Sequence, residues 1–178
     1  AAFGHRRLAI LDVTEAGHQP MVSSDGNVIL VYNGEVYNFP KLKQELIREG
    51  YHFKGHSDTE VVLNALHCWG RDAIMRFNGM FAFAAWFRNE NRILLARDRY
   101  GIKPLYYYNS SDSFLFASEV KALRQHPAFR FGVSEDALVE YFSFQNIFSD
   151  VTLFEGVKLL PAGHFIEVFP VRKVKEPV

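Results

Sequence analysis

The pattern of apolar and polar positions divides the chain into short runs typical of strands and longer amphipathic segments typical of helices. Strand-like runs, most of them ending in Gly, Asn, Asp or Pro, occupy residues 7–13, 27–32, 80–87, 92–96, 105–108, 113–117 and 164–169. Helical patterns occupy residues 39–49, 59–69, 72–77, 119–124 and 135–142. Because the strands are neighbours around a block of helices, we predict an α+β fold with largely antiparallel sheets.

Three of these helices begin at residue types that cap helix N-termini. The predicted caps are Asn38, followed by Pro40 in the first turn, either Ser57 or Asp58, and Ser134. The run 80–87 is apolar at every position, and successive strand side chains point to opposite faces of a sheet. Both faces of this strand must therefore be covered, which favours two sheets with helical layers over a single sheet with one face in water.

Composition limits the choice of partners and location. The 178 residues suffice for one domain with a sizeable core. Lys plus Arg and Asp plus Glu number 20 each, so the net charge is zero and nothing supports capture of nucleic acid or of a charged membrane surface. No apolar run is long enough to span a membrane. A single cysteine, Cys68, excludes an intramolecular disulfide and favours a cytoplasmic setting.

The two ends of the sequence indicate a piece of a longer protein. The chain opens without Met at the edge of the strand pattern 7–13, and residues 170–178 form a basic, proline-bracketed tail typical of a linker. A processed or trimmed whole domain remains the alternative.

The stretch around Asn33 and Gly34 is the first candidate site, because an apolar run ends there in a polar, glycine-containing segment. The side-chain amide of Asn33 and the unshielded backbone N–H of Gly34 could together polarise one substrate oxygen. The alternative is a plain hairpin turn, which Asn-Gly commonly marks.

Two charged residues extend this candidate. Arg7, at the start of a strand, can offer a bidentate fork to a carboxylate, although pairing with Asp12 would explain it equally well. Asp58 can receive an ammonium group, although an N-cap is the commoner role for an acid at a helix start. One carboxylate reader, one ammonium reader and one carbonyl polariser together describe a pocket for an α-amino acid that carries an amide.

Other chemistry finds little support in the residues. Cys68 lies within a helical pattern with no feature that would lower a thiol pKa, so we interpret it as a core residue. The seven His are scattered without the spacing of metal ligands, so we interpret them as loop or surface residues and predict no metal site. The glycine turn at 97–105 lacks the patterns of nucleotide-binding loops.

Six motifs, taken in order, resemble the class II glutamine amidotransferase domain of glutamine-hydrolysing asparagine synthetases. They are GHRRLAILD (4–12), YNGEVYN (32–38), SDTE (57–60), NGMFAFA (78–84), ARDRYGIKPLYY (96–107) and SEVKAL (118–123). The resemblance covers residues 4–169. It implies an N-terminal-nucleophile hydrolase fold, an αββα sandwich of two mainly antiparallel sheets between helical layers, truncated at the N-terminus. Residues 1–169 would be the amidotransferase domain and 170–178 a linker towards an absent synthetase domain.

The resemblance also implies roles for individual residues. Arg7 would hold the glutamine α-carboxylate, and Asp58 with the backbone of Gly34 and Glu35 would hold its α-ammonium group. Backbone groups of Leu8, Ile10 and Leu11 would line the same pocket, and Asn33 and Gly34 would form the oxyanion hole. Glutamine would be hydrolysed to glutamate and ammonia, which a C-terminal synthetase domain would use with ATP and Mg²⁺ to convert aspartate to asparagine. The amidotransferase domain itself would need no cofactor; a homodimer is left open.

One departure from the family pattern bears on activity. Members of the family use an N-terminal Cys as nucleophile, and this sequence begins after that segment, so we expect the chain alone to be inactive. Three interpretations stay open: a domain that lacks its upstream piece, a non-catalytic scaffold or glutamine-binding module of the same fold, and an amidotransferase that feeds a different acceptor in a sugar or antibiotic pathway.

Overall fold

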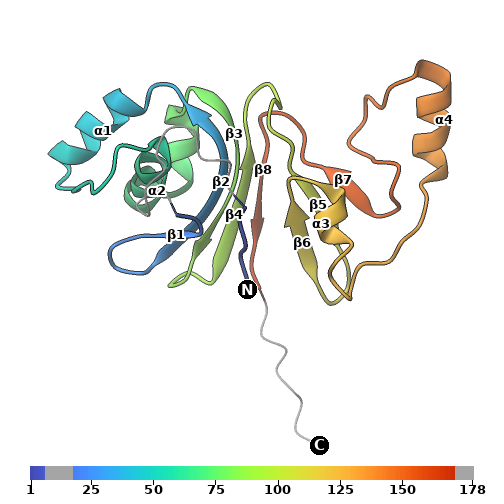
Figure 1. Cartoon of the computed structure of the whole chain (residues 1–178), viewed down its shortest axis with the longest axis horizontal. Helices are drawn as coiled ribbons and strands as arrows, with labels where there is room; N and C mark the ends of the chain where they lie inside the picture. The colour runs from blue at the N-terminus through green and yellow to red at the C-terminus, as the bar shows by residue number, and fades with distance from the viewer. Residues whose placement is uncertain (7–17, 171–178) are drawn as a thin grey trace, which may run out of the picture. The chain divides into compact units, whose positions relative to one another are not determined.

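The computed structural model of the chain describes residues 1–6 and 18–170 (Figure 1). The predicted strand at 7–13, and with it Arg7, Leu8, Ile10 and Leu11, lies outside the described residues. The chain divides into two compact units, the first formed by Ala1–Gly79, Phe83–Leu95 and Phe165–Val178 and the second by Met80–Ala82 and Ala96–His164. No helix in the described ranges has the length and apolar character needed to cross a membrane.

A five-stranded sheet holds most of its residues in the first unit. Its strands, in spatial order, are β1 (Met21–Val22), β2 (Val28–Val36), β3 (Gly79–Phe87), β4 (Arg92–Arg97) and β8 (Phe165–Val168). The strands predicted at 27–32, 80–87, 92–96 and 164–169 are thereby confirmed, although β2 is four residues longer at its end. The sequence did not predict β1, because two residues are too few to show a period. β1 pairs antiparallel with β2, and Met21 lies opposite Leu30.

The centre of this sheet is buried. Every residue of β3 from Phe81 to Ala85 is buried. Phe83 also packs its ring edge-on against Phe77, with 6.5 Å between ring centroids. The prediction that both faces of this strand are covered is confirmed.

Two helices of the first unit pack together, and the second of them covers β2. They are α1 (Phe39–Arg48) and α2 (Asp58–Trp69), which lie side by side in Figure 1. Ser57 is the N-cap of α2, because its hydroxyl accepts a hydrogen bond from the Glu60 N–H at 3.4 Å. The helix predicted at 72–77 is a 3₁₀ segment, η2 (Gly70–Arg76), which follows α2 directly.

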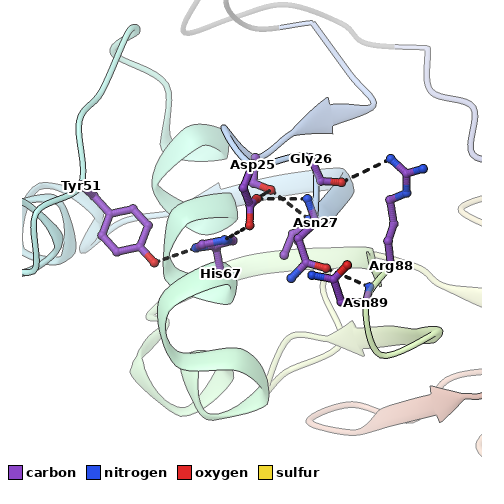
Figure 2. Close-up of polar contacts among 9 residues, drawn as sticks. Asp25, Gly26, Asn27, Tyr51, His67, Arg88 and Asn89 are labelled. Atoms are coloured by element: carbon purple, nitrogen blue, oxygen red, sulfur yellow. Dashed lines mark hydrogen bonds and ion pairs between the residues drawn. The ribbon is translucent and has the colours of Figure 1, made fainter.

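A polar chain of three side chains ties α2 to the turn between β1 and β2 (Figure 2). The Tyr51 hydroxyl lies 2.7 Å from Nδ1 of His67, and Nε2 of His67 lies 3.0 Å from Asp25. Burial, aided by a contact with Cys68, raises the pKa of Tyr51 to about 12. His67 is therefore a half-buried helix residue and not a loop residue. Cys68, which was predicted to lie in the core, is half-buried.

The second unit is built on a three-stranded antiparallel sheet. Its strands, in spatial order, are β6 (Phe114–Ala117), β5 (Tyr106–Asn109) and β7 (Val157–Leu159), and its helices are α3 (Val120–Leu123) and α4 (Glu135–Phe144). Tyr106 of β5 lies opposite Ala117 on one side and Leu159 on the other. The predicted strands at 105–108 and 113–117 and helices at 119–124 and 135–142 are confirmed. Ser134 caps α4, as predicted. Among the helices and strands of the second unit, β7 is the one that was not predicted.

The loop after β4 is closed by two adjacent charged residues. The Arg97 guanidinium donates to the carbonyl oxygens of Lys103, Leu160 and Gly101 at 2.6–2.8 Å. The buried carboxylate of Asp98 accepts four backbone N–H groups, those of Phe81, Tyr100, Ile102 and Lys103. Both charges therefore serve the loop's own backbone and its neighbours in the second unit.

Candidate active site

The candidate site lies at the end of β2. Asn33, Gly34 and Glu35 are strand residues, and β2 continues through Val36, so the interpretation of Asn33-Gly34 as a hairpin turn is wrong. Gly34 has a φ of 158°, which is close to extended backbone, and the left-handed turn conformation is not adopted there. The strand stays extended because residues far away in the sequence take up its hydrogen bonds.

Asp58 supplies the first of these hydrogen bonds. Its buried carboxylate accepts the Val36 N–H at 3.0 Å and the Tyr32 hydroxyl at 2.7 Å, both on Oδ2. Ser57 fills the capping position, so the interpretation of Asp58 as the N-cap of α2 is wrong. Asp58 instead joins the first turn of α2 to the strand on both sides of Asn33, Gly34 and Glu35. Its other oxygen, Oδ1, accepts no hydrogen bond from the part of the chain that the structure describes.

The hydroxyl of Tyr32 is fixed as a donor in this arrangement. Tyr32 is buried, and burial together with the neighbouring Asp58 carboxylate raises the pKa of the phenol far above its usual range. The phenol therefore keeps its proton at any physiological pH and continues to donate to Asp58. A Tyr at the end of a buried strand needs a partner for its hydroxyl, and this need was the signal in the sequence that could have revealed the contact.

The side-chain amide of Asn33, unlike the side chains of Tyr32 and Asp58, is not engaged by the described residues. Asn33 is half-buried, and none of the hydrogen bonds among residues 1–6 and 18–170 involves its side chain. An amide held on a strand without a protein partner can donate to a ligand oxygen at small reorganisation cost. Gly34 follows Asn33 directly on the same strand.

A second set of hydrogen bonds links the end of β2 to the residues just before β3. The Tyr37 N–H donates to the Asn78 carbonyl at 2.8 Å. The side chain of Asn38 donates to the Arg76 carbonyl and accepts the Asn78 N–H, both at 2.9 Å. Asn38 occupies the N-cap position of α1, as predicted, but its side chain makes no capping hydrogen bond there. Its side chain secures the segment that follows the candidate site.

Gly79 permits the close approach of β3 to this segment. A Cβ at position 79 would overlap the carbonyl oxygen of Glu35 and would lie 2.8 Å from the Cα of Val36. Both neighbours are backbone atoms, which cannot rotate away as a flexible side chain can. Only glycine therefore allows β3 to begin directly beside Glu35.

Replacing Gly79 by alanine is expected to lower the free energy of unfolding by about 1–3 kcal/mol, because an overpacked site must displace its surroundings. Chemical denaturation of the wild type and the variant measures this difference. Gly4→Ala is the matched control, since a Cβ there meets nothing within 4 Å. Equal stability of Gly79→Ala and Gly4→Ala would contradict the steric argument.

The structure thus brings together four of the predicted site residues, Asn33, Gly34, Glu35 and Asp58. The other four, Arg7, Leu8, Ile10 and Leu11, belong to the range that is not described. Sequence reasoning missed the supporting roles of Tyr32, Asn78 and Gly79, because each depends on a partner distant in the sequence. Within the described residues, no group of three or more His, Cys, Asp or Glu side chains is placed to hold a metal ion.

Comparisons with known proteins identify the family of the chain. Residues 1–176 match a family model described as a glutamine amidotransferase domain. Asparagine synthetase [glutamine-hydrolyzing] 3 of Bacillus subtilis is 40% identical over 165 residues, which cover 91% of this chain and 27% of that protein. Amidase chry2 of Gibberella zeae is 36% identical over 92% of this chain and 24% of its own length. The chain thus spans about a quarter of the length of these curated relatives.

A solved structure shares the fold. The glutamine phosphoribosylpyrophosphate amidotransferase of B. subtilis, in complex with ADP and GMP, superposes with a TM-score of 0.51 and 28% identity. The match covers 60% of this chain and 25% of that one. This likeness confirms the predicted α+β class.

Proposed function

Because the chain belongs to the glutamine amidotransferase domain family, we propose that it is the glutaminase domain of an asparagine synthetase. In this proposal it hydrolyses glutamine to glutamate and ammonia, and the parent protein uses the ammonia to convert aspartate to asparagine with ATP. The observation that carries the proposal is the half-buried Asn33 amide, free of described hydrogen bonds, next to Gly34 on a strand that Asp58 holds in place.

The Asn33 amide and the Gly34 N–H form the oxyanion hole in this proposal. Attack on the glutamine side-chain amide turns its carbonyl oxygen into an oxyanion, which needs donors that are already in position. The extended backbone of β2 supports this role, because it fixes two adjacent donors on one rigid element. The anchoring of Val36 by Asp58 reduces the freedom of the segment from its far side.

Asp58 binds the α-ammonium group of glutamine in this proposal, together with backbone groups of Gly34 and Glu35. Its Oδ2 is engaged by Tyr32 and Val36, so Oδ1 is the oxygen that would meet the ammonium group. Arg7 would bind the α-carboxylate, and the backbone of Leu8, Ile10 and Leu11 would line the pocket. These four roles rest on the family resemblance alone.

Replacing Asp58 by asparagine in the full-length parent protein is expected to raise KM for glutamine about 10- to 100-fold. A hydrogen bond to a charged group contributes about 1.5–3 kcal/mol, and each 1.4 kcal/mol is tenfold in affinity. Asparagine keeps an oxygen that can accept from Tyr32 and Val36, so the variant removes the charge and spares the anchor. Steady-state kinetics of glutamate release measures the effect.

Asp72→Asn is the matched control for this experiment, since Asp72 is an exposed acid in η2. Its KM for glutamine should equal that of the wild type. If Asp58→Asn also keeps the wild-type KM, Asp58 does not bind the ammonium group and serves only to anchor β2.

The nucleophile is not assigned within this chain. Its single thiol, Cys68, lies on α2, one residue after the His67 that is bound to Tyr51 and Asp25. The family resemblance assigns the nucleophile to an N-terminal Cys, whose amine serves as base. The experiment that tests the proposed function is therefore glutamate release from glutamine by the full-length parent protein, with amide-¹⁵N glutamine to follow the nitrogen. Failure to release glutamate would overturn it.

The acceptor of the ammonia is a separate part of the proposal. The B. subtilis relative is named a glutamine-hydrolyzing asparagine synthetase, which supports aspartate as acceptor. A cytoplasmic location and the use of ATP and Mg²⁺ by the synthetase part belong to the same proposal and rest on the family resemblance alone. The similarity to Amidase chry2 supports a second candidate, an amidotransferase that serves another acceptor. Mass spectrometry of the product formed with aspartate, ATP, Mg²⁺ and ¹⁵N-glutamine distinguishes the two: labelled asparagine appears only in the first case.

A further inference from the structure

Helix α4 of the second unit is poorly covered by its own unit. Figure 1 shows it standing apart from the three-stranded sheet β6-β5-β7. Of its ten residues, only Ala137 is buried. A ten-residue helix is marginal in water and normally depends on packing of an apolar face. The packing that would stabilise α4 is thus largely absent from the described part of the chain.

The exposed side chains of this region are large and apolar. Val139, Phe142 and Phe144 of α4 are 67%, 78% and 65% exposed, and Phe148 in the following loop is 73% exposed. Phe142 packs edge-on against Tyr141, and Phe144 packs edge-on against Phe148, each with 5.9 Å between ring centroids. A cluster of exposed aromatic residues of this kind marks an interaction surface more often than an ordinary solvent-facing helix.

One carboxylate fixes the loop onto the helix. Glu140 accepts the N–H groups of Phe148 and Ser149 at 2.6 and 3.1 Å and the Ser149 hydroxyl at 2.6 Å. These hydrogen bonds lower the pKa of Glu140, which therefore stays ionised at neutral pH. The ring of Phe148 is consequently held beside Phe144 in an exposed position. An aromatic surface that is arranged in advance loses less conformational entropy when a partner binds.

The charges around this surface indicate the chemistry of the partner. Residues 131–149 contain Glu135, Asp136 and Glu140 and no Lys or Arg. A complementary partner presents an apolar depression for the aromatic rings with basic residues at its rim. The chain matches only about a quarter of the length of its curated relatives, so the relatives carry a large additional stretch of polypeptide.

We propose that α4 and the loop to Ser149 form the docking surface for this additional polypeptide, which under the proposed function is the synthetase part of the parent protein. The identity of the partner rests on the proposed function; the need for a partner rests on the exposed aromatic residues. Docking there would bury the rings of Phe142, Phe144 and Phe148 and set their acidic surroundings against basic side chains.

Hydroxyl-radical footprinting of the full-length parent protein tests the inference without any mutation. We expect Phe142, Phe144 and Phe148 to be oxidised at least tenfold more slowly than their exposure predicts, after correction for intrinsic reactivity. Met75, which is 79% exposed in the first unit, serves as the reference. Oxidation of the three rings at the rate expected for exposed Phe would overturn the inference. Protection that disappears on dilution, together with a dimer, would overturn it in favour of a second copy as occupant.

A pair of variants separates this inference from the proposed function. Phe142→Asp in the full-length protein should keep glutamate release within about twofold of the wild type, and should lose most glutamine-dependent formation of the final product. Met75→Asp, the matched control, should keep both. Normal coupling in Phe142→Asp would overturn the docking inference, whereas absence of glutamate release from the wild type would overturn the proposed function and leave the footprinting result valid.

Discussion

Replacing Asn33 by alanine in the full-length parent protein is expected to lower kcat for glutamine hydrolysis by about 10²–10³-fold. KM should change little, because the amide meets the substrate oxygen most strongly once that oxygen carries negative charge. The half-buried Asn33 amide makes no hydrogen bond with the described residues, so its removal leaves none of their polar groups unsatisfied. The loss should therefore appear in catalysis and not in folding.

Two measurements isolate this effect of Asn33. Synthesis from added ammonia, which bypasses glutamine hydrolysis, should proceed at the wild-type rate in Asn33→Ala. Asn109→Ala is the matched control, because Asn109 is an exposed residue at the end of β5. It should hydrolyse glutamine normally. A loss of less than threefold in Asn33→Ala would exclude this side chain from the oxyanion hole, and a parallel loss of ammonia-dependent synthesis would indicate general damage.

Elements with local signals were predictable from the sequence. The start of α2 follows from Ser57, whose hydroxyl accepts a hydrogen bond only three residues away, and the start of α4 follows from Ser134 in the same manner. The apolar run of β3 predicts a strand that is covered on both faces. In each case the residues that determine the element lie within it or immediately before it.

The end of β2 could not be predicted in this way. Asn-Gly normally favours a turn. Here hydrogen bonds between residues far apart in the sequence outweigh that preference: one joins Val36 to Asp58, 22 residues later, and another joins Tyr37 to Asn78. Asn38 shows the same competition. Its side chain forms hydrogen bonds with the backbone of Arg76 and Asn78 and makes no capping hydrogen bond to the nearby N-terminus of α1. Tertiary contacts of this kind have no local signature.

The candidate site likewise has a part that the sequence predicts and a part that only the fold reveals. The residue types at Asn33, Gly34 and Asp58 indicated their chemistry, because an amide, an unshielded N–H and a carboxylate suit an oxyanion and an ammonium group. Their support did not appear in the pattern. That one oxygen of Asp58 anchors Tyr32 and Val36, and that Gly79 must lack a Cβ, became visible only when β2, β3 and α2 were placed together.

The second large effect is expected at Asp98, in the loop after β4. Replacing Asp98 by alanine should lower the free energy of unfolding by about 3–5 kcal/mol. Its buried carboxylate accepts the N–H groups of Tyr100 and Ile102 on Oδ1 and those of Phe81 and Lys103 on Oδ2. Each buried donor left without an acceptor costs about 1–3 kcal/mol, and water can replace the carboxylate for some of them.

Asparagine at position 98 tests whether both oxygens are needed. An amide offers one acceptor oxygen and one NH₂ group, so it can satisfy either pair of N–H groups and must point a donor at the other. Asp98→Asn should therefore be destabilised nearly as much as Asp98→Ala. The exposed Asp72→Ala is the control and should differ from the wild type by less than about 0.5 kcal/mol. Chemical denaturation at pH 7 provides all of these values.

The pH dependence of these differences identifies the ionised carboxylate as the stabilising form. Burial alone would raise the pKa of Asp98, but the four backbone N–H groups outweigh it, and the net result is a lowered pKa. A carboxyl group whose pKa is lower in the folded than in the unfolded state stabilises the fold fully above its unfolded pKa, near 3.9, and loses that contribution as pH falls through the folded value. The gap in stability between wild type and Asp98→Asn should thus be constant from pH 7 to about 5 and shrink below pH 4. A gap that stays unchanged down to the lowest pH at which the protein folds would show that the charge of Asp98 contributes nothing to closing the loop.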